Sequence, residues 1–231
     1  MSMELTAVLS GNRYPGRGLV LGKSADGDVI AAYFIMGRST NSRNRIFSRT
    51  ADGIRTEAHD PALLADPSLI IYHPVRDTKD GLVLTNGDQT DTIADAIATG
   101  GSFESALFTR TFEPDAPNFT PRISAILAAD GSYKLASLRS VNGDGSKTCR
   151  AFWEYPAAEK GCGHFLHTYA ADGNPLPSFS VDPEEVTLPG GSAAEICQTI
   201  YDALDAENRI SVYVYRLHDG AVDTAIINKN A

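Results

Sequence analysis

The chain has 231 residues, 42% of them hydrophobic, and a formal net charge of −9 at pH 7. This length and apolar content can build a complete core, and we expect one domain spanning residues 1–231. The acidic balance excludes general binding to nucleic acid or to an anionic membrane, because both need a broad excess of lysine and arginine.

The sequence also predicts the compartment. The start, MSMELTAVLSGNR, lacks the basic and apolar regions of a signal peptide, and no apolar run approaches the roughly 20 residues that span a bilayer. The three cysteines, Cys149, Cys162 and Cys197, are an odd number without the spacing of a disulfide framework. We therefore expect a cytoplasmic protein.

The first distinctive stretch is a hairpin followed by a basic loop. Two apolar runs, residues 19–21 and 29–35, flank the turn sequence SADGD and predict two strands. Between Arg13 and Arg49 the chain has seven basic and two acidic residues. Arginines interleaved with small hydrogen-bonding side chains suit a phosphate-bearing molecule, although an ordinary solvated loop has the same composition.

Short strands are predicted next. Residues 46–50 and 54–57 form a pair, LIIYHPV at 69–75 is predicted to be a strand, and a turn at 77–81 leads to a strand at 82–85. Their short connections make these strands antiparallel.

The polar sequence NGDQTD, residues 86–91, lies between this strand and a predicted helix. Backbone amides at a helix start favour anions, but an ordinary capping loop would look the same. The helix is predicted from the spacing of Ile93, Ala96 and Ile97, and Ser102 can cap a second helix directly after it.

The second half of the chain is mostly predicted strand. Strand pairs are expected at residues 123–128 with 133–138, 151–155 with 164–169, and 210–217 with 222–227. Residues 142–146 and 174–189 are predicted surface loops, and Ser192 opens an amphipathic helix with a capping-box pattern. Many antiparallel strands, two adjacent central helices and one late helix predict an α+β layered protein.

Several other sites are not supported. Gly16, Gly18 and Gly22 precede a strand instead of following one, which argues against a dinucleotide fingerprint. Cys162, His164 and His167 lack a suitably spaced fourth metal ligand, and residues 164 and 167 of a strand face opposite sides. We expect no metal.

Three motifs, taken together, resemble a known family. GRSTNSRNR at residues 37–45, TNGDQTD at 85–91 and NFTPRI at 118–123 look like the archaeal-type IMP cyclohydrolase family in their order and spacing. The resemblance runs from about residue 14 to 126 and is weaker beyond. It implies a four-layer αββα sandwich, similar to N-terminal-nucleophile hydrolases and built mostly of antiparallel sheets, without use of a terminal nucleophile.

The resemblance also implies an activity in purine biosynthesis. The family closes the purine ring of 5-formamidoimidazole-4-carboxamide ribonucleotide to give IMP and water, without a cofactor. The carboxamide nitrogen attacks the formyl carbon within one molecule, so the enzyme has to position the two groups, move protons and stabilise an oxyanion. The expected partner is a purine nucleotide, and the oligomeric state, including a homo-oligomer, stays open.

The resemblance implies a set of site residues, most of them in the three motifs, with Arg17 and Tyr72 outside these motifs. The expected catalytic residues are Arg38, Tyr72, Asn86 and Asp91. The expected substrate-binding residues are Arg17, Asn41, Arg43, Arg45, Gly87, Thr120 and Arg122. Two alternatives remain, an amidohydrolase on the same scaffold and a nucleotide-binding module without catalysis.

Overall fold

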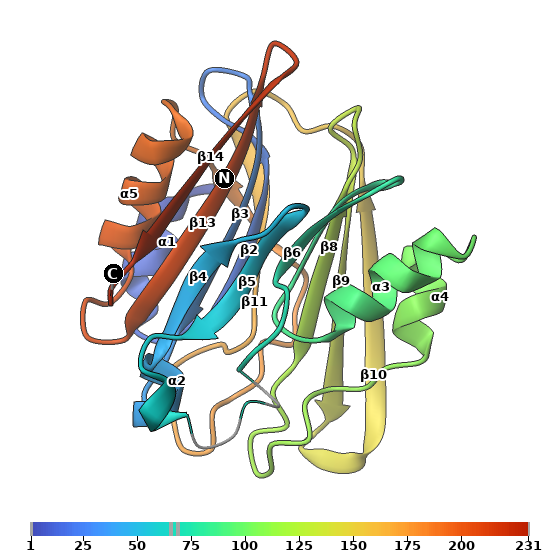
Figure 1. Ribbon diagram of the computed structural model, residues 1–231, viewed down its shortest axis with the longest axis vertical. Helices are drawn as coiled ribbons and strands as arrows, with labels where there is room; N and C mark the ends of the chain where they lie inside the picture. The colour runs from blue at the N-terminus through green and yellow to red at the C-terminus, as the bar shows by residue number, and fades with distance from the viewer. Residues whose placement is uncertain (1, 65–66, 68–69, 231) are drawn as a thin grey trace.

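Two seven-stranded β-sheets make up most of the protein (Figure 1), for which a computed structural model describes residues 2–64, 67 and 70–230. The first sheet has the strand order β1-β12-β11-β2-β3-β13-β14 and the second the order β10-β9-β8-β7-β6-β5-β4. Neighbouring strands are antiparallel, except that β1 pairs with β12 in parallel. The structure is therefore an α+β protein with mostly antiparallel sheets.

The first sheet contains β1 (Met3–Glu4), β2 (Arg17–Lys23), β3 (Val29–Met36), β11 (Cys162–His167), β12 (Glu184–Thr187), β13 (Arg209–His218) and β14 (Ala221–Asn228). The second sheet contains β4 (Arg45–Arg49), β5 (Gly53–Ala58), β6 (Val75–Thr78), β7 (Gly81–Thr85), β8 (Arg122–Leu127), β9 (Tyr133–Val141) and β10 (Asp144–Tyr155). The helices are α1 (Leu5–Gly11), α2 (Thr40–Arg43), α3 (Gln89–Ala98), α4 (Phe103–Phe108) and α5 (Ala193–Ala203), with a short 3₁₀ turn at Pro61–Leu63.

Alternation along the strands sorts the core into three groups. On β2, Leu19 and Leu21 pack between the two sheets, whereas Val20 packs on the other face of the first sheet, with α1 and α5. On the second sheet, Val83 packs against α3 and α4. Figure 1 shows α1 and α5 on the outer face of the first sheet and α3 and α4 on the outer face of the second. Each fully buried aliphatic side chain stabilises the fold by about 1.5–3 kcal/mol.

Two predicted helix starts are confirmed by their caps. The Ser102 and Ser192 side chains accept hydrogen bonds from the backbone N–H three residues later, and each makes a reciprocal capping box. Helix α1 was not predicted, because its seven residues lack a capping side chain at Glu4. No helix among the described residues is long and apolar enough to cross a membrane.

The predicted strand at residues 69–75 is wrong. Residue 69 lies outside the described residues, residues 70–74 have no strand structure, and only Val75 belongs to a strand, β6. Proline cannot donate a ladder hydrogen bond, and Pro74 lies at the end of this segment. Instead, Tyr72 is tied to Thr56: its backbone N–H donates to Thr56 Oγ1 (2.9 Å) and its carbonyl accepts from the Thr56 N–H (2.9 Å).

The predicted pairing of residues 151–155 with 164–169 is also wrong. Strand β10 pairs with β9 in the second sheet, whereas β11 pairs with β2 and β12 in the first. The intervening segment crosses between the sheets instead of turning back. Of the predicted loop at 142–146, only residues 142 and 143 form the β9-β10 turn, and residues 144–146 belong to β10. The predicted loop at 174–189 contains β12.

Candidate functional site

Two arginines begin strands at the same end of the sheets, near α2 at the lower end of Figure 1. Arg17 begins β2, and alternation places its side chain on the face of Leu19, between the sheets. Arg45 begins β4 and shares the face of Phe47, which packs in the same layer. The inter-sheet core therefore ends in two guanidinium groups.

Arg45 is 1% exposed and only partly hydrogen-bonded. Its Nε donates to the Ser42 carbonyl oxygen (2.7 Å) and its Nη2 to the Met36 carbonyl oxygen (3.2 Å). Its Nη1 is buried without a hydrogen-bond partner, as is Nε of Arg17. A buried unpaired donor costs about 1–3 kcal/mol, so two at one end of the core call for an explanation such as a ligand.

A pair of phenols lies in the same layer. Tyr33, from the middle of β3, and Tyr72 place their hydroxyl oxygens 2.8 Å apart, and both side chains are buried. Burial raises the pKa of Tyr33 well above its ordinary value, against the opposing effect of the Arg17 charge. Tyr33 is therefore a neutral hydroxyl that can donate or relay a proton.

Glu113 adds a buried carboxyl group. Its Oε2 lies 3.5 Å from Nη2 of Arg17, and its Oε1 accepts from Asn86 Nδ2 at 3.4 Å. Burial raises the pKa of Glu113, while the charges of Arg17 and Arg122 act in the opposite direction. Such a carboxyl group holds its proton to a higher pH than an exposed glutamate does.

Thr120 links this carboxyl region to the first sheet. Its Oγ1 lies 2.5 Å from Asp115 Oδ2 and 2.5 Å from the Tyr169 hydroxyl oxygen. An ionised carboxylate only accepts, so Thr120 donates to Asp115 and accepts from Tyr169. Burial raises the pKa of Tyr169 to about 12, and its ring stacks on Tyr14 with centroids 5.9 Å apart.

We refer to these groups as the buried polar cluster. Its members are Arg17, Tyr33, Arg45, Tyr72, Asn86, Glu113, Thr120 and Tyr169. Five of these eight residues were predicted as site residues from the sequence, and the structure brings the five to one end of the sheets. They are Arg17, Arg45, Tyr72, Asn86 and Thr120. They combine cations, neutral hydroxyls and one carboxyl group in a buried setting, where electrostatic interactions are strong.

The Asn86 side chain fixes the junction between β7 and β8. Its Oδ1 accepts from the Ile123 N–H (2.9 Å) and its Nδ2 donates to the Pro121 carbonyl oxygen (2.9 Å). The next residue must be small, because a Cβ on Gly87 would lie 2.6 Å from Arg122 Nη1. Arg122 itself donates to Gln89 Oε1 (2.6 Å) and pairs with Asp88 (2.6 Å), on the side of α3.

Other predicted site residues lie apart from the cluster. Arg43 donates to the Gly37 carbonyl oxygen (3.0 Å) and to Asn208 Oδ1 (3.1 Å), so it does not converge with Arg45. Asp91, on α3, pairs with Arg76 (3.0 Å) and His73 (3.2 Å). Asn41 lies in α2, and its Oδ1 is buried without a partner.

Arg38 is a predicted site residue with a partly exposed side chain. It pairs with Asp172 (2.5 Å), donates to the Gly173 carbonyl oxygen (2.9 Å) and lies 4.9 Å above the Tyr14 ring. Its side chain is 37% exposed. Because Tyr14 stacks on Tyr169, Arg38 lies at the solvent side of the buried polar cluster.

Sequence reasoning missed Tyr33, Glu113 and Tyr169. Tyr33 shares one face of β3 with Ala31 and Ile35, so the alternation along this strand could have predicted that its side chain lies between the sheets. Glu113 lies in the loop before Pro114, where no periodicity points inward. Its burial depends on contacts with distant residues.

The described residues contain no group of three His, Cys, Asp or Glu side chains that could hold a metal ion. Both histidines of the Cys162, His164 and His167 group have other partners. His164 Nδ1 lies 2.6 Å from the Tyr133 hydroxyl, and His167 Nδ1 lies 2.9 Å from the Tyr169 carbonyl oxygen. The three cysteines are free thiols.

Comparison with known proteins adds family information. The profile of a family described as IMP cyclohydrolase-like protein matches residues 14–221. A Methanococcus maripaludis protein named IMP cyclohydrolase is 28% identical over 212 residues, which cover 90% of this chain and 96% of that protein. One from Methanococcus aeolicus is 27% identical over 82% of this chain and 88% of that protein. One from Methanopyrus kandleri is 39% identical over 117 residues, covering 49% of this chain and 58% of that protein.

Proposed function

The chain belongs to the IMP cyclohydrolase-like family, and from this membership we propose that it is an IMP cyclohydrolase. It closes the purine ring of 5-formamidoimidazole-4-carboxamide ribonucleotide to give IMP and water. The observation that carries the proposal to particular residues is the pair of buried arginine nitrogens without partners, Arg17 Nε and Arg45 Nη1, beside the Tyr33–Tyr72 phenol pair. A buried site with free donors is suited to a developing negative charge.

The reaction needs proton movements more than new covalent chemistry. The carboxamide nitrogen bonds to the formyl carbon and loses one proton, while the formyl oxygen gains one. That oxygen then leaves as water after a second protonation, and the formamido nitrogen loses its proton as the ring double bond forms. Two groups that exchange protons therefore have to lie near the two substituents.

Tyr33 and Tyr72 form one such group in the proposal. Their hydroxyls are hydrogen-bonded at 2.8 Å, so the pair can accept a proton from the carboxamide nitrogen while releasing one to the formyl oxygen. Glu113 forms the other, because burial raises its pKa and keeps it able to donate a proton to the departing oxygen. Arg17 and Arg45 stabilise the negative charge on the formyl oxygen during attack.

The nucleotide phosphate is assigned to the exposed side of the cluster. Arg38 has a half-exposed side chain whose partners, Asp172 and the Gly173 carbonyl, belong to a loop. A guanidinium can exchange a carboxylate for a phosphate with little change in geometry. Arg43 is not assigned to this role, since its donors already bind Gly37 and Asn208.

We extend the proposal to the fold. A four-layer αββα sandwich similar to N-terminal-nucleophile hydrolases is supported by the packing of α1 and α5 on one sheet and of α3 and α4 on the other. A single domain over residues 1–231 is supported by the first sheet, which contains both β1 and β14. The proposed chemistry uses no terminal nucleophile.

The test is incubation of the purified protein with the formamido ribonucleotide, followed by chromatography of the products. We expect IMP. An amidohydrolase would instead release formate and the 5-amino ribonucleotide, and a nucleotide-binding module would bind the substrate without product. Either of these outcomes would overturn the proposal.

A further inference from the structure

A second feature lies at the end of β11, beside α1 on the side of the first sheet that carries this helix. A cavity of about 410 Å³ is bordered by α1, by the end of β11 and by β12. Its walls include the apolar side chains of Val8, Phe179 and Val181, and it contains His167 and Glu184. No lysine or arginine is among its described lining residues.

His167 is held firmly in one orientation. Its side chain is 4% exposed, its ring centroid lies 3.9 Å from that of Phe179, and its Nδ1 lies 2.9 Å from the Tyr169 carbonyl oxygen. A carbonyl oxygen only accepts hydrogen bonds, so Nδ1 carries the proton. In the neutral ring, Nε2 is then a hydrogen-bond acceptor.

That acceptor has no donor. His167 Nε2 and Glu184 Oε2 are both buried atoms without a hydrogen-bond partner, and they lie 3.5 Å apart. Two acceptors facing each other in a partly apolar cavity are unfavourable unless a donor comes between or beside them. The carboxylate adds a negative charge, so a positively charged donor is favoured over a neutral one.

We propose that this cavity binds a small organic cation, a primary ammonium group on a short hydrocarbon body. The ammonium donates to His167 Nε2 and Glu184 Oε2, and the hydrocarbon packs against Val8, Phe179 and Val181. An ammonium has three donors and no acceptor, which matches the two unpaired acceptors, His167 Nε2 and Glu184 Oε2. The inference is independent of the ring-closing activity.

The test is calorimetric titration of the whole chain with three probes of equal length, n-butylammonium, n-butanol and butyrate. We expect saturable binding of n-butylammonium alone. Equal binding of n-butanol would mean that the cavity is merely apolar, and no binding of n-butylammonium would mean that water alone fills it. Either result overturns the proposal.

A matched pair of variants tests the carboxylate. Glu184→Gln should weaken n-butylammonium binding by about tenfold or more, since it removes a charge-assisted hydrogen bond. Glu185→Gln makes the same change in net charge on the next residue of β12, which is exposed and faces the other way. Equal weakening by both variants would indicate general attraction to an acidic chain and overturn the proposal.

The state of His167 supplies an independent readout. Nitrogen-15 NMR of the histidine rings should give a neutral His167 with the proton on Nδ1 in the free protein. Addition of n-butylammonium should shift the His167 Nε2 resonance. An imidazolium paired with Glu184 in the free protein would remove the missing donor and overturn the proposal.

Discussion

The hydroxyl oxygens of Tyr33 and Tyr72 lie 2.8 Å apart, although Tyr33 belongs to the first sheet and Tyr72 to the segment that leads into the second. Their hydrogen bond spans the layer between the sheets at the end where Arg17 and Arg45 begin their strands. A proton relay and two cations therefore meet in one buried region.

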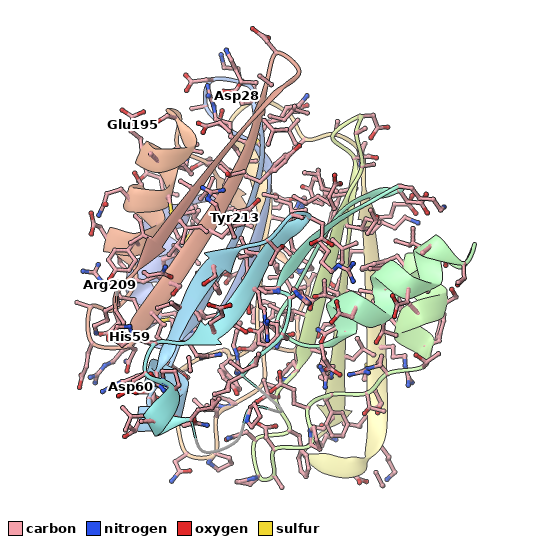
Figure 2. All side chains as sticks on the ribbon, in the orientation of Figure 1. Asp28, His59, Asp60, Glu195, Arg209 and Tyr213 are labelled. Atoms are coloured by element: carbon pink, nitrogen blue, oxygen red, sulfur yellow. The ribbon has the colours of Figure 1, made fainter. Side chains whose placement is uncertain are left out.

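Replacing one phenol should impair catalysis more than stability. Tyr72→Phe keeps the ring but removes the proton relay, so we expect kcat to fall by about a hundredfold or more. Tyr213→Phe is the control, because Tyr213 is also buried between the sheets but lies outside the buried polar cluster (Figure 2). Steady-state rates and thermal unfolding check both variants, and equal kcat values would contradict the relay.

Glu113 should control the alkaline side of the rate profile. Burial raises the pKa of its carboxyl group, so the protonated acid persists above the range of an exposed glutamate. As the proton donor, Glu113 should cause kcat to fall when the pH rises through its pKa. Glu113→Gln should lower kcat and abolish this fall, as measured by kcat from pH 5 to pH 9. An unchanged profile in the variant would argue against a role for Glu113 as the acid.

Ring closure should persist after treatment with a chelator. The proposed steps are proton transfers within one molecule, and no metal-ligating group of three His, Cys, Asp or Glu side chains lies within the described ranges. Dialysis against EDTA should leave the rate of IMP formation unchanged. Loss of activity that a divalent ion restores would refute this expectation.

A clamp far from the buried polar cluster should govern stability in acid. Asp28 accepts from Arg216 Nε (2.9 Å) and lies 2.7 Å from His218 Nδ1, at the upper end of the molecule in Figure 2. The hydrogen bond from His218 lowers the pKa of Asp28, with a further contribution from Arg216. The stabilisation is therefore full above the unfolded-state pKa of about 3.9 and is lost as the pH falls through the lower folded-state pKa.

Denaturant unfolding of the parent and Asp28→Asn measures this effect. The parent should be more stable at pH 6, and the difference should shrink below about pH 4 as the Asp28 carboxylate becomes protonated. Asp219→Asn, at a side chain 92% exposed in the β13-β14 turn next to His218, should change little at either pH. A difference that is constant down to pH 2 would contradict the clamp.

The parts of the fold that local patterns determine could be predicted from the sequence. The SADGD hairpin and the Ser192 helix are confirmed, because turn chemistry and capping depend on neighbouring residues. The partners of β10 and β11 could not be predicted, because the connection between them crosses from one sheet to the other. Residues 70, 72 and 74 are buried although residues 70–74 do not form a strand, so the apolar pattern of this segment led to a wrong strand prediction.

The candidate site shows the same division. The resemblance led us to expect Arg17, Arg45 and Tyr72 in the site, although only Arg45 lies within one of the three motifs. Tyr169 and Glu113 could be identified only from the tertiary structure. Tyr169 contacts Thr120, which is 49 residues away in the sequence, and Glu113 lies in an irregular loop.

The account depends most on the location of catalysis, and Arg45→Lys and Arg43→Lys test it as a matched pair. Both variants keep the charge and lose the guanidinium fork, but only Arg45 has a buried nitrogen left free for a ligand. The measurement is kcat/KM for IMP formation from the formamido ribonucleotide, with thermal unfolding to confirm that both variants fold. The account predicts a loss of about tenfold to a hundredfold for Arg45→Lys, which corresponds to one charge-assisted hydrogen bond, and parental activity for Arg43→Lys. Parental activity in a folded Arg45→Lys, or an equal loss in both variants, would contradict it.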